Sequence, residues 1–130
     1  MSGAPMLLAV IAISLGASFG ALARWGLALW LGVGGALPLG TLAANLIGGY
    51  LIGVVVASLA LVPDISPAWR LALVTGFLGG LTTFSSFSME VVTMLMEGEL
   101  GAALLTACAH LCGSLALTWL GVKTVRAFTA

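Results

Sequence analysis

Residues 76–88 read Gly76-Phe77-Leu78-Gly79-Gly80-Leu81-Thr82-Thr83-Phe84-Ser85-Ser86-Phe87-Ser88, inside an apolar segment without a charge between Arg70 and Glu90. Glycine costs about 1 kcal/mol per helical position relative to alanine, and Ser and Thr hydroxyls compete for backbone hydrogen bonds. In a bilayer, freed backbone groups must find partners within the protein or line a hydrated cavity. The stretch therefore predicts a membrane-spanning helix that is broken at a site where something polar binds or passes.

Two aromatic residues follow the glycines. Phe84 and Phe87 lie at positions i and i+3, so they share a face of a helix that resumes after the break. An aromatic ring is electropositive at its edge, and ring edges beside hydroxyl groups could hold a small anion without a formal positive charge. Carbonyl groups freed around Gly79 and Thr82 could instead hold a small cation. From these residues alone, the chain is a channel or transporter for a small solute, with an anion, water or a small cation all open.

The composition indicates an integral membrane protein. The 130 residues are 62% hydrophobic and 6% charged, with no net charge, whereas about 25% of residues are charged in a soluble domain. There is no basic patch to neutralise phosphates, so nucleic acid is not an expected partner. The sequence has no nucleophile–base set with a credible context, no metal-spaced His and Cys cluster and no phosphate-binding loop, so we do not expect an enzyme.

Four segments are long and apolar enough to cross a bilayer, which takes about 20 residues in a helix. They cover residues 6–31, 40–61, 69–96 and 101–122. The connections between them are short and contain Gly, Pro or acidic residues. We therefore predict an all-α integral membrane protein, in which residues 1–130 form a single four-helix unit whose third helix is broken.

The few charges carry weak information about orientation. With four spans, both termini and the second connection lie on one side of the membrane, and that side holds Arg70, Lys123 and Arg126. The opposite side holds Glu97 and Glu99. The positive-inside rule weakly favours cytoplasmic termini, and insertion in both orientations remains open.

Three spans carry a stripe of small or polar residues at helical spacing. The stripes are Gly16 and Gly20 on the first span; Thr41, Asn45, Gly49 and Gly53 on the second; and Thr106, His110, Ser114 and Thr118 on the fourth. Lipid supplies no hydrophobic drive between helices, so close packing of small residues must hold the spans together. Because four short spans enclose little, we expect a self-associating assembly that brings these stripes together.

Four polar residues within the spans each allow two interpretations. Asn45 is either interhelical glue or part of a polar site. Glu90 is either a functional group or a carboxylate near the interface, bonded to a neighbouring hydroxyl. Arg24 either snorkels to the headgroups or gives the mouth of a pore a positive potential. His110 is either a packing residue or a proton carrier.

Two stretches together resemble the Fluc/CrcB fluoride channel family: residues 40–49, Gly-Thr-Leu-Ala-Ala-Asn-Leu-Ile-Gly-Gly, and residues 76–90. The elements Gly20-x-x-x-Arg24-Trp25 and His110-x-x-Gly113-Ser114 extend the resemblance over almost the whole chain. One departure is Ser86, which stands where threonine is common and retains the hydroxyl.

The resemblance implies an antiparallel, dual-topology homodimer in the bacterial inner membrane, with two pores that export cytoplasmic fluoride passively. It implies that the pore is formed by Phe84, Phe87, Asn45, Ser114, Ser85, Ser88, Thr118 and Glu90. It further implies a vestibule at Arg24 and a structural sodium ion (Na+) at the dimer interface, bound by the backbone carbonyls of Gly79 and Thr82.

A different class, the small four-span proton-coupled multidrug exporters, looks similar in size and composition. Those proteins exchange protons for cations through a buried carboxylate in their first span. Here residues 6–31 contain no acidic residue, which disfavours an exporter. A purely structural membrane subunit would leave the Phe84–Phe87 stretch without a purpose.

Overall fold

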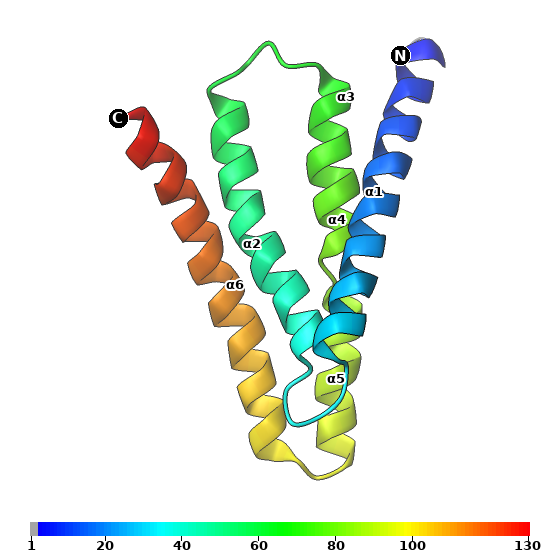
Figure 1. Ribbon diagram of the computed structural model, residues 1–130, viewed down its shortest axis with the longest axis vertical. Helices are drawn as coiled ribbons and strands as arrows, with labels where there is room; N and C mark the ends of the chain where they lie inside the picture. The colour runs from blue at the N-terminus through cyan, green and yellow to red at the C-terminus, as the bar shows by residue number, and fades with distance from the viewer. Residues whose placement is uncertain (1–2) are drawn as a thin grey trace.

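The computed structural model describes residues 3–130, and their side chains from residue 5 onward. This part of the chain is helical throughout, apart from short connections. The elements are α1 (Gly3–Leu31), α2 (Leu39–Ala60), α3 (Pro67–Arg70), the π-helix η1 (Leu71–Leu78), α4 (Gly79–Leu81), α5 (Phe84–Met96) and α6 (Leu100–Thr129). α3, η1, α4 and α5 follow one another along one broken third span (Figure 1). Four segments are therefore long and apolar enough to cross a membrane, as predicted.

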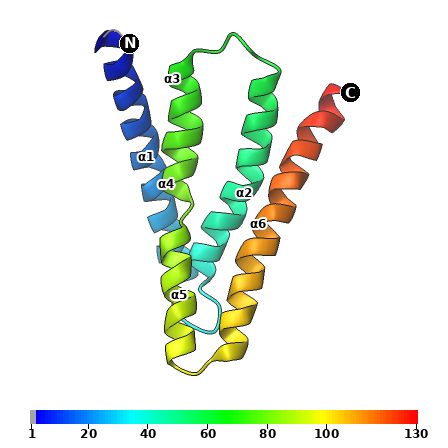
Figure 2. The same cartoon turned by 180° about the vertical axis from the view of Figure 1, so that it is seen from behind.

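The helices lie roughly along one axis and fan out toward the end that holds both termini (Figure 1). α1 lies beside the third span, and α2 lies between the third span and α6 (Figure 2). The α2–α3 connection is at the same end as the termini, whereas the α1–α2 and α5–α6 connections are at the other. This arrangement brings the break in the third span next to the first half of α2 and the middle of α6.

Glycines on α1 and on the third span pack against one another. A Cβ added to Gly16 would collide with the carbonyl oxygen of Ala72, and one on Gly80 would lie 2.5 Å from the carbonyl oxygen of Ala17. A Cβ on Gly76 would lie 3.0 Å from the Cα of Gly16. Gly76 and Gly80 therefore allow close helix contact. The expectation that they contribute to the break was wrong, because both lie within helical segments.

The stripes on α2 and α6 also meet within the chain. A Cβ on Gly49 would lie 3.0 Å from the carbonyl oxygen of Ser114, and one on Gly53 would collide with that of Thr118. The hydroxyl of Thr118 lies 2.9 Å from the Gly49 carbonyl oxygen, to which it donates. The stripes of α2 and α6 thus pack against each other inside one chain, so these contacts do not require self-association.

The helix ends follow local sequence signals. Gly98 adopts a φ of 80° and ends α5, with the Glu99 N–H donating back to the Met94 carbonyl oxygen at 2.8 Å, as in a Schellman motif. The helices begin and end within three residues of the predicted spans, except at the C-terminal end. There α6 continues past Val122 to Thr129.

The small core lies at the level of the break. Ala44 of α2 and Leu78 and Leu81 of the third span are at most 4% exposed. Large apolar side chains elsewhere are mostly on the outside, including Leu15, with 59% of its surface exposed. Lipid hydrocarbon tolerates an apolar exterior around such a small core, whereas water does not. Together with the four apolar spans, this exterior indicates an integral membrane protein.

Candidate functional site

The break in the third span consists of two residues. Thr82 (φ −84°, ψ 156°) and Thr83 (φ −152°, ψ 118°) are extended, whereas Gly79–Leu81 are still helical. The helix resumes at Phe84 because the Thr83 hydroxyl oxygen accepts a hydrogen bond from the Ser86 N–H at 3.2 Å. Thr83 is therefore the N-cap of α5. Two adjacent threonines, and not the three glycines before them, form the break.

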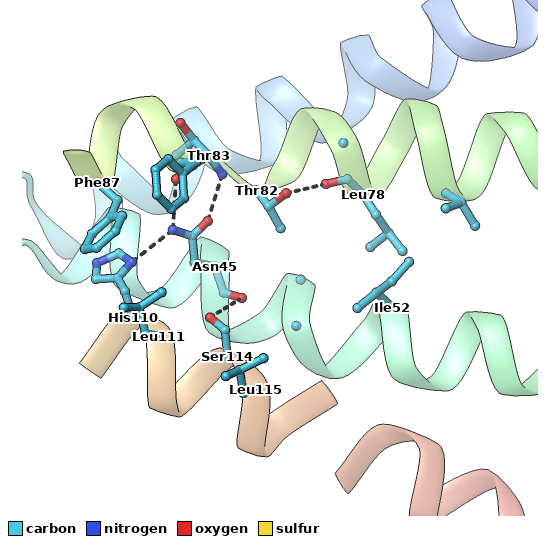
Figure 3. Close-up of a pocket in the computed structure, with 15 residues that line it drawn as sticks. Asn45, Ile52, Leu78, Thr82, Thr83, Phe87, His110, Leu111, Ser114 and Leu115 are labelled. Carbon is cyan, nitrogen blue, oxygen red and sulfur yellow. Dashed lines mark hydrogen bonds between the residues drawn. The ribbon is translucent and has the colours of Figure 1, made fainter. Parts of the chain in front are cut away.

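Asn45 of α2 pairs with the backbone of Thr83. Its Oδ1 accepts from the Thr83 N–H at 2.8 Å, and its Nδ2 donates to the Thr83 carbonyl oxygen at 3.0 Å. Nδ2 also lies 2.9 Å from Nδ1 of His110 on α6. Both N–H groups of the amide are thus engaged within the chain (Figure 3). In this arrangement Asn45 connects three spans, in agreement with the interhelical interpretation of its role.

The same contacts divert the helical donors of the Gly79 and Thr82 carbonyls. A continuous helix would pair the Gly79 carbonyl with the Thr83 N–H and the Thr82 carbonyl with the Ser86 N–H. Those donors bind Asn45 and the Thr83 hydroxyl instead. The neighbouring Gly80 carbonyl, by contrast, accepts from Nε of Arg24 at 3.1 Å.

Three rings pack together beside the break. Phe84 and Phe87 are in edge-to-face contact, with centroids 5.4 Å apart and planes at 76°. Phe87 also stacks on the imidazole of His110 at 4.5 Å and 25°. Phe87 is 7% exposed and Phe84 is 73% exposed. The two phenylalanines therefore share a helix face, as predicted, but in one chain only Phe87 is enclosed.

A cavity of about 450 Å³ lies between α2, the third span and α6 (Figure 3). It brings together six residues that the sequence analysis singled out for the pore and the cation site: Asn45, Gly79, Thr82, Phe84, Phe87 and Ser114. Its wall also includes Thr83, His110 and apolar side chains. The polar groups of this cavity are hydroxyls, one amide, one imidazole and carbonyls, without a charged side chain.

Glu90 lies at a second cavity, also of about 450 Å³, near the α1–α2 and α5–α6 connections. Its Oε1 accepts a hydrogen bond from the Thr41 hydroxyl. Its Oε2 is buried without a hydrogen-bond partner among the described residues. Ser86, Glu97 and Glu99 line the same cavity. The hydrogen bond agrees with one of the two interpretations of Glu90 from the sequence, a carboxylate bonded to a neighbouring hydroxyl. That interpretation does not account for the unsatisfied Oε2.

The remaining predicted residues line neither cavity. Ser85 is exposed, with its hydroxyl 3.3 Å from that of Thr83. Ser88 is half-buried one turn beyond Phe84. The Thr118 hydroxyl faces the Gly49 and Ser114 carbonyl oxygens, each at 2.9 Å. Arg24 is held at the Gly80 carbonyl. Within one chain the structure thus does not bring these four residues to the cavity at the break.

Two residues that are central to the site, Thr83 and His110, were not assigned to it from the sequence. For Thr83 a signal was present, because a threonine before a helical stretch is a common N-cap. For His110 the spacing on α6 placed it in the same stripe as Ser114. No local pattern could reveal that it contacts Asn45, which is 65 residues away in sequence.

Residues 11–122 match a known family, described as CrcB-like protein, Camphor Resistance (CrcB). The chain belongs to this family. All of the site residues above lie within the matched CrcB-like region.

Individual relatives are similar to this chain over nearly their full length. A relative from Variovorax paradoxus (strain S110) is 73% identical over 125 residues, covering 96% of this chain and 100% of the relative. A relative from Albidiferax ferrireducens is 62% identical, covering 92% of each chain. One from Burkholderia mallei is 52% identical, covering 96% of this chain and 98% of the relative. Each of these relatives carries the name "Fluoride-specific ion channel FluC".

Proposed function

We propose that this protein is a fluoride channel that lets the anion leave the cytoplasm passively, and is not an enzyme. The observation that carries the proposal is the 73% identity, over the full length of the relative, to a protein named as a fluoride-specific ion channel. The site agrees with it, because the aromatic pair and the polar groups surround a cavity at the break without a cationic side chain.

Passive export is sufficient on physical grounds. Hydrogen fluoride is a weak acid that crosses membranes in its neutral form and dissociates in a less acidic cytoplasm, so the anion accumulates. A negative-inside potential favours exit of an anion by about 2.3 kcal/mol per 100 mV. A selective pore therefore needs no energy source. Weak partial charges suit conduction, because a site must bind the ion and also release it.

The path we propose follows this cavity past the edges of Phe84 and Phe87. Ser114 suits an anion-facing role, because its hydroxyl makes only a long 3.5 Å contact with the Asn45 carbonyl oxygen and can turn to another acceptor. Ser85, Ser88, Thr118 and Glu90 would continue the path, with Arg24 at a vestibule. In one chain, Asn45 could donate to the anion only by releasing Thr83 or His110.

The working unit we propose is an antiparallel homodimer with two pores, inserted in both orientations in the inner membrane of a bacterium. The 73% exposure of Phe84 in one chain supports a second copy, because the pore needs this ring enclosed. In detergent we expect a measured mass of two chains per complex. A single-chain mass in a preparation that conducts fluoride would rule the dimer out.

We further propose that a sodium ion is bound at the break by the Gly79 and Thr82 carbonyls. These two are the ones whose helical donors are diverted to Asn45 and Thr83, and unwound carbonyls are typical ligands of Na+. Among residues 3–130 there is no group of three or more His, Cys, Asp or Glu that could hold a metal. A second copy would contribute a matching pair.

A proton-coupled exporter is not supported. Its mechanism needs an acidic residue in the first span, and none is present in α1. The carboxylate of Glu90, which lies in the third span, accepts a hydrogen bond from Thr41.

The test is fluoride efflux from proteoliposomes, followed with a fluoride electrode. We expect rapid, non-saturating fluoride efflux and no chloride efflux. Phe87→Ile and Phe84→Ile keep an apolar side chain but remove the ring edge, which is worth about 0.5–1.5 kcal/mol in aromatic contacts. We therefore expect each variant to reduce the rate about tenfold.

A matched control is Phe128→Ile, because Phe128 is 88% exposed in the last turn of α6. It should conduct like the unmodified protein. Slow, saturating, proton-coupled transport by the unmodified protein would contradict a channel. Unchanged rates in both pore variants would remove the rings from the mechanism.

A further inference from the structure

The C-terminal helix α6 is longer than a bilayer requires. It has 30 residues, Leu100–Thr129, and is therefore about 45 Å long, whereas the hydrocarbon core is about 30 Å thick. Glu99 lies directly before α6, and a charged side chain is costly within the hydrocarbon. Counted from there, the roughly 20 helical residues that cross the core end near Trp119. Residues 120–129 therefore lie at the level of the lipid headgroups.

Three side chains share one face of this end of α6. Trp119, Lys123 and Arg126 follow one another at spacings of four and three residues, which places them in one row on a helix. Trp119 is 62% exposed, and Nζ of Lys123 lies 5.1 Å from the centre of its ring. This cation–π contact keeps the ammonium group beside the indole. An exposed Trp is typical of the membrane–water interface, in agreement with the boundary counted from Glu99.

The positive charge on this face is not balanced by its own helix. α6 contains no acidic residue. The acidic residue at this end of the molecule, Asp64, lies in the α2–α3 connection, and α6 diverges from that connection toward its C-terminus (Figures 1 and 2). Arg70, a third cation at this end, donates to the carbonyl oxygens of Leu59 and Val62 at 3.3 and 3.4 Å. The protein thus uses Arg70 to bind the end of α2, whereas the cations of α6 face outward.

We propose that Trp119, Lys123 and Arg126 bind the headgroup of an anionic phospholipid. The phosphate of such a lipid lies just outside the hydrocarbon, at the level of these side chains. A guanidinium can bind two phosphate oxygens at once, and an ammonium adds a point charge. The indole N–H supplies a further donor at the same boundary. An anionic lipid is preferred to a zwitterionic one because its headgroup has no cation to oppose the two basic side chains. The site does not depend on which solute the protein conducts.

Quenching of Trp119 fluorescence by brominated lipid tests the proposal directly. The chain has four tryptophans, and the other three, Trp25, Trp30 and Trp69, are each more than half exposed. Replacing these three with Phe leaves Trp119 as the one indole. The protein is then placed in phosphatidylcholine vesicles that contain either brominated phosphatidylglycerol or brominated phosphatidylcholine at equal mole fraction.

We expect Trp119 to be quenched preferentially by the anionic lipid. A basic residue near an anionic bilayer surface strengthens binding by a factor of about five, so the two residues should give a relative binding constant of about ten or more. Lys123→Gln combined with Arg126→Gln should abolish the preference, whereas Lys123→Arg should retain it. A matched control keeps Trp30 as the one indole. Trp30 is 79% exposed at the end of α1, whose last turn has no basic residue, and it should show no preference.

A second measurement uses the protein with all of its tryptophans. A ligand that binds only the folded state raises the unfolding temperature. Added phosphatidylglycerol should therefore raise this temperature in detergent more than phosphatidylcholine does, and the double Gln variant should lose the difference.

Equal quenching of Trp119 by the two lipids would overturn the proposal. So would a preference that persists in the double Gln variant, because it would not come from Lys123 and Arg126. If the single-tryptophan protein does not fold, the unfolding temperature decides the question, and equal shifts with the two lipids would overturn the site. None of these outcomes bears on the channel proposal, which fluoride efflux tests separately.

Discussion

At the scale of single residues, Asn45 is the side chain on which most of the site depends. One amide satisfies both backbone groups of Thr83 and orients His110. By taking the Thr83 N–H it also releases the Gly79 carbonyl from the helix. The polar interior of an uncharged site is thus organised by a neutral group, which can donate and accept at once.

Asn45→Asp tests this arrangement. The carboxylate can still accept from the Thr83 N–H, but it cannot donate to the Thr83 carbonyl or to His110, and it places a negative charge beside the anion path. We expect fluoride efflux to be lost. A buried carbonyl left without a donor costs about 1–3 kcal/mol, so the unfolding temperature should also fall by several degrees.

The control for Asn45→Asp is Tyr50→Phe, which removes a hydroxyl bonded to Thr124 in another part of the α2–α6 contact. Efflux in that variant should be normal, and its unfolding temperature should change less. If Asn45→Asp conducted fluoride like the unmodified protein, Asn45 would lie outside the pore and its link to Thr83 would be dispensable.

At the scale of helices, the distance between α1 and the third span is set by glycine. Gly16 on α1 faces Gly76, Gly20 lies against the backbone of Phe77 and Leu81, and Gly80 lies against the backbone of Ala17. The same close packing lets the Arg24 side chain reach the carbonyl oxygen of Gly80, which lies in α4 just before the break. Close packing therefore positions the segment that carries the break, because there is no hydrophobic force between helices in lipid to do so.

Gly80→Ala should destabilise the protein. Its Cβ would lie 2.5 Å from the Ala17 carbonyl oxygen and 3.1 Å from the Ala17 Cα, so the helices must separate. Overpacking of this kind costs about 1–3 kcal/mol. We expect a drop of several degrees in the unfolding temperature, measured through tryptophan fluorescence.

Gly26→Ala provides a matched comparison. It is also a helical glycine, on α1, but an added Cβ would meet nothing within 4 Å. Alanine is favoured over glycine in a helix by about 1 kcal/mol, so this variant should be as stable as the unmodified protein or more so. Equal unfolding temperatures for Gly80→Ala and Gly26→Ala would mean that the glycine contact does not determine the packing.

At the scale of the whole molecule, one chain encloses only part of the proposed site. Phe84 is mostly exposed, and the Gly79 and Thr82 carbonyls alone are too few for a cation that prefers several oxygen ligands. Both features are accounted for if a second copy covers this face. The proposed sodium ion would then stabilise the dimer, since a ligand that binds only the folded state adds stability.

Removal of sodium tests this assembly. Protein exchanged from sodium chloride into the chloride salt of a large organic cation should unfold at a lower temperature. A ligand present at 100 times its dissociation constant contributes about 2.7 kcal/mol, so the shift should be readily measured. Readdition of sodium should reverse the shift. Unfolding curves that do not depend on sodium would leave the Gly79 and Thr82 carbonyls without the role proposed here.

The sequence by itself determined the class, the four spans and the interruption of the third. These properties are local: hydropathy over about 20 residues defines a span, and helical spacing places Phe84 and Phe87 on one face. It also indicated that Asn45 and Glu90 matter, because polar groups within a span need partners.

Only the tertiary structure decided which groups are the hydrogen-bond partners of these side chains. It assigned Gly76 and Gly80 to helix packing, placed the break at Thr82 and Thr83, and joined Asn45 to residues 38 and 65 positions away. A local pattern shows that a donor must be satisfied but not by which distant group. The partner depends on how the helices approach one another. Backbone contacts at glycine set this approach, and each such contact joins two segments that are distant in sequence.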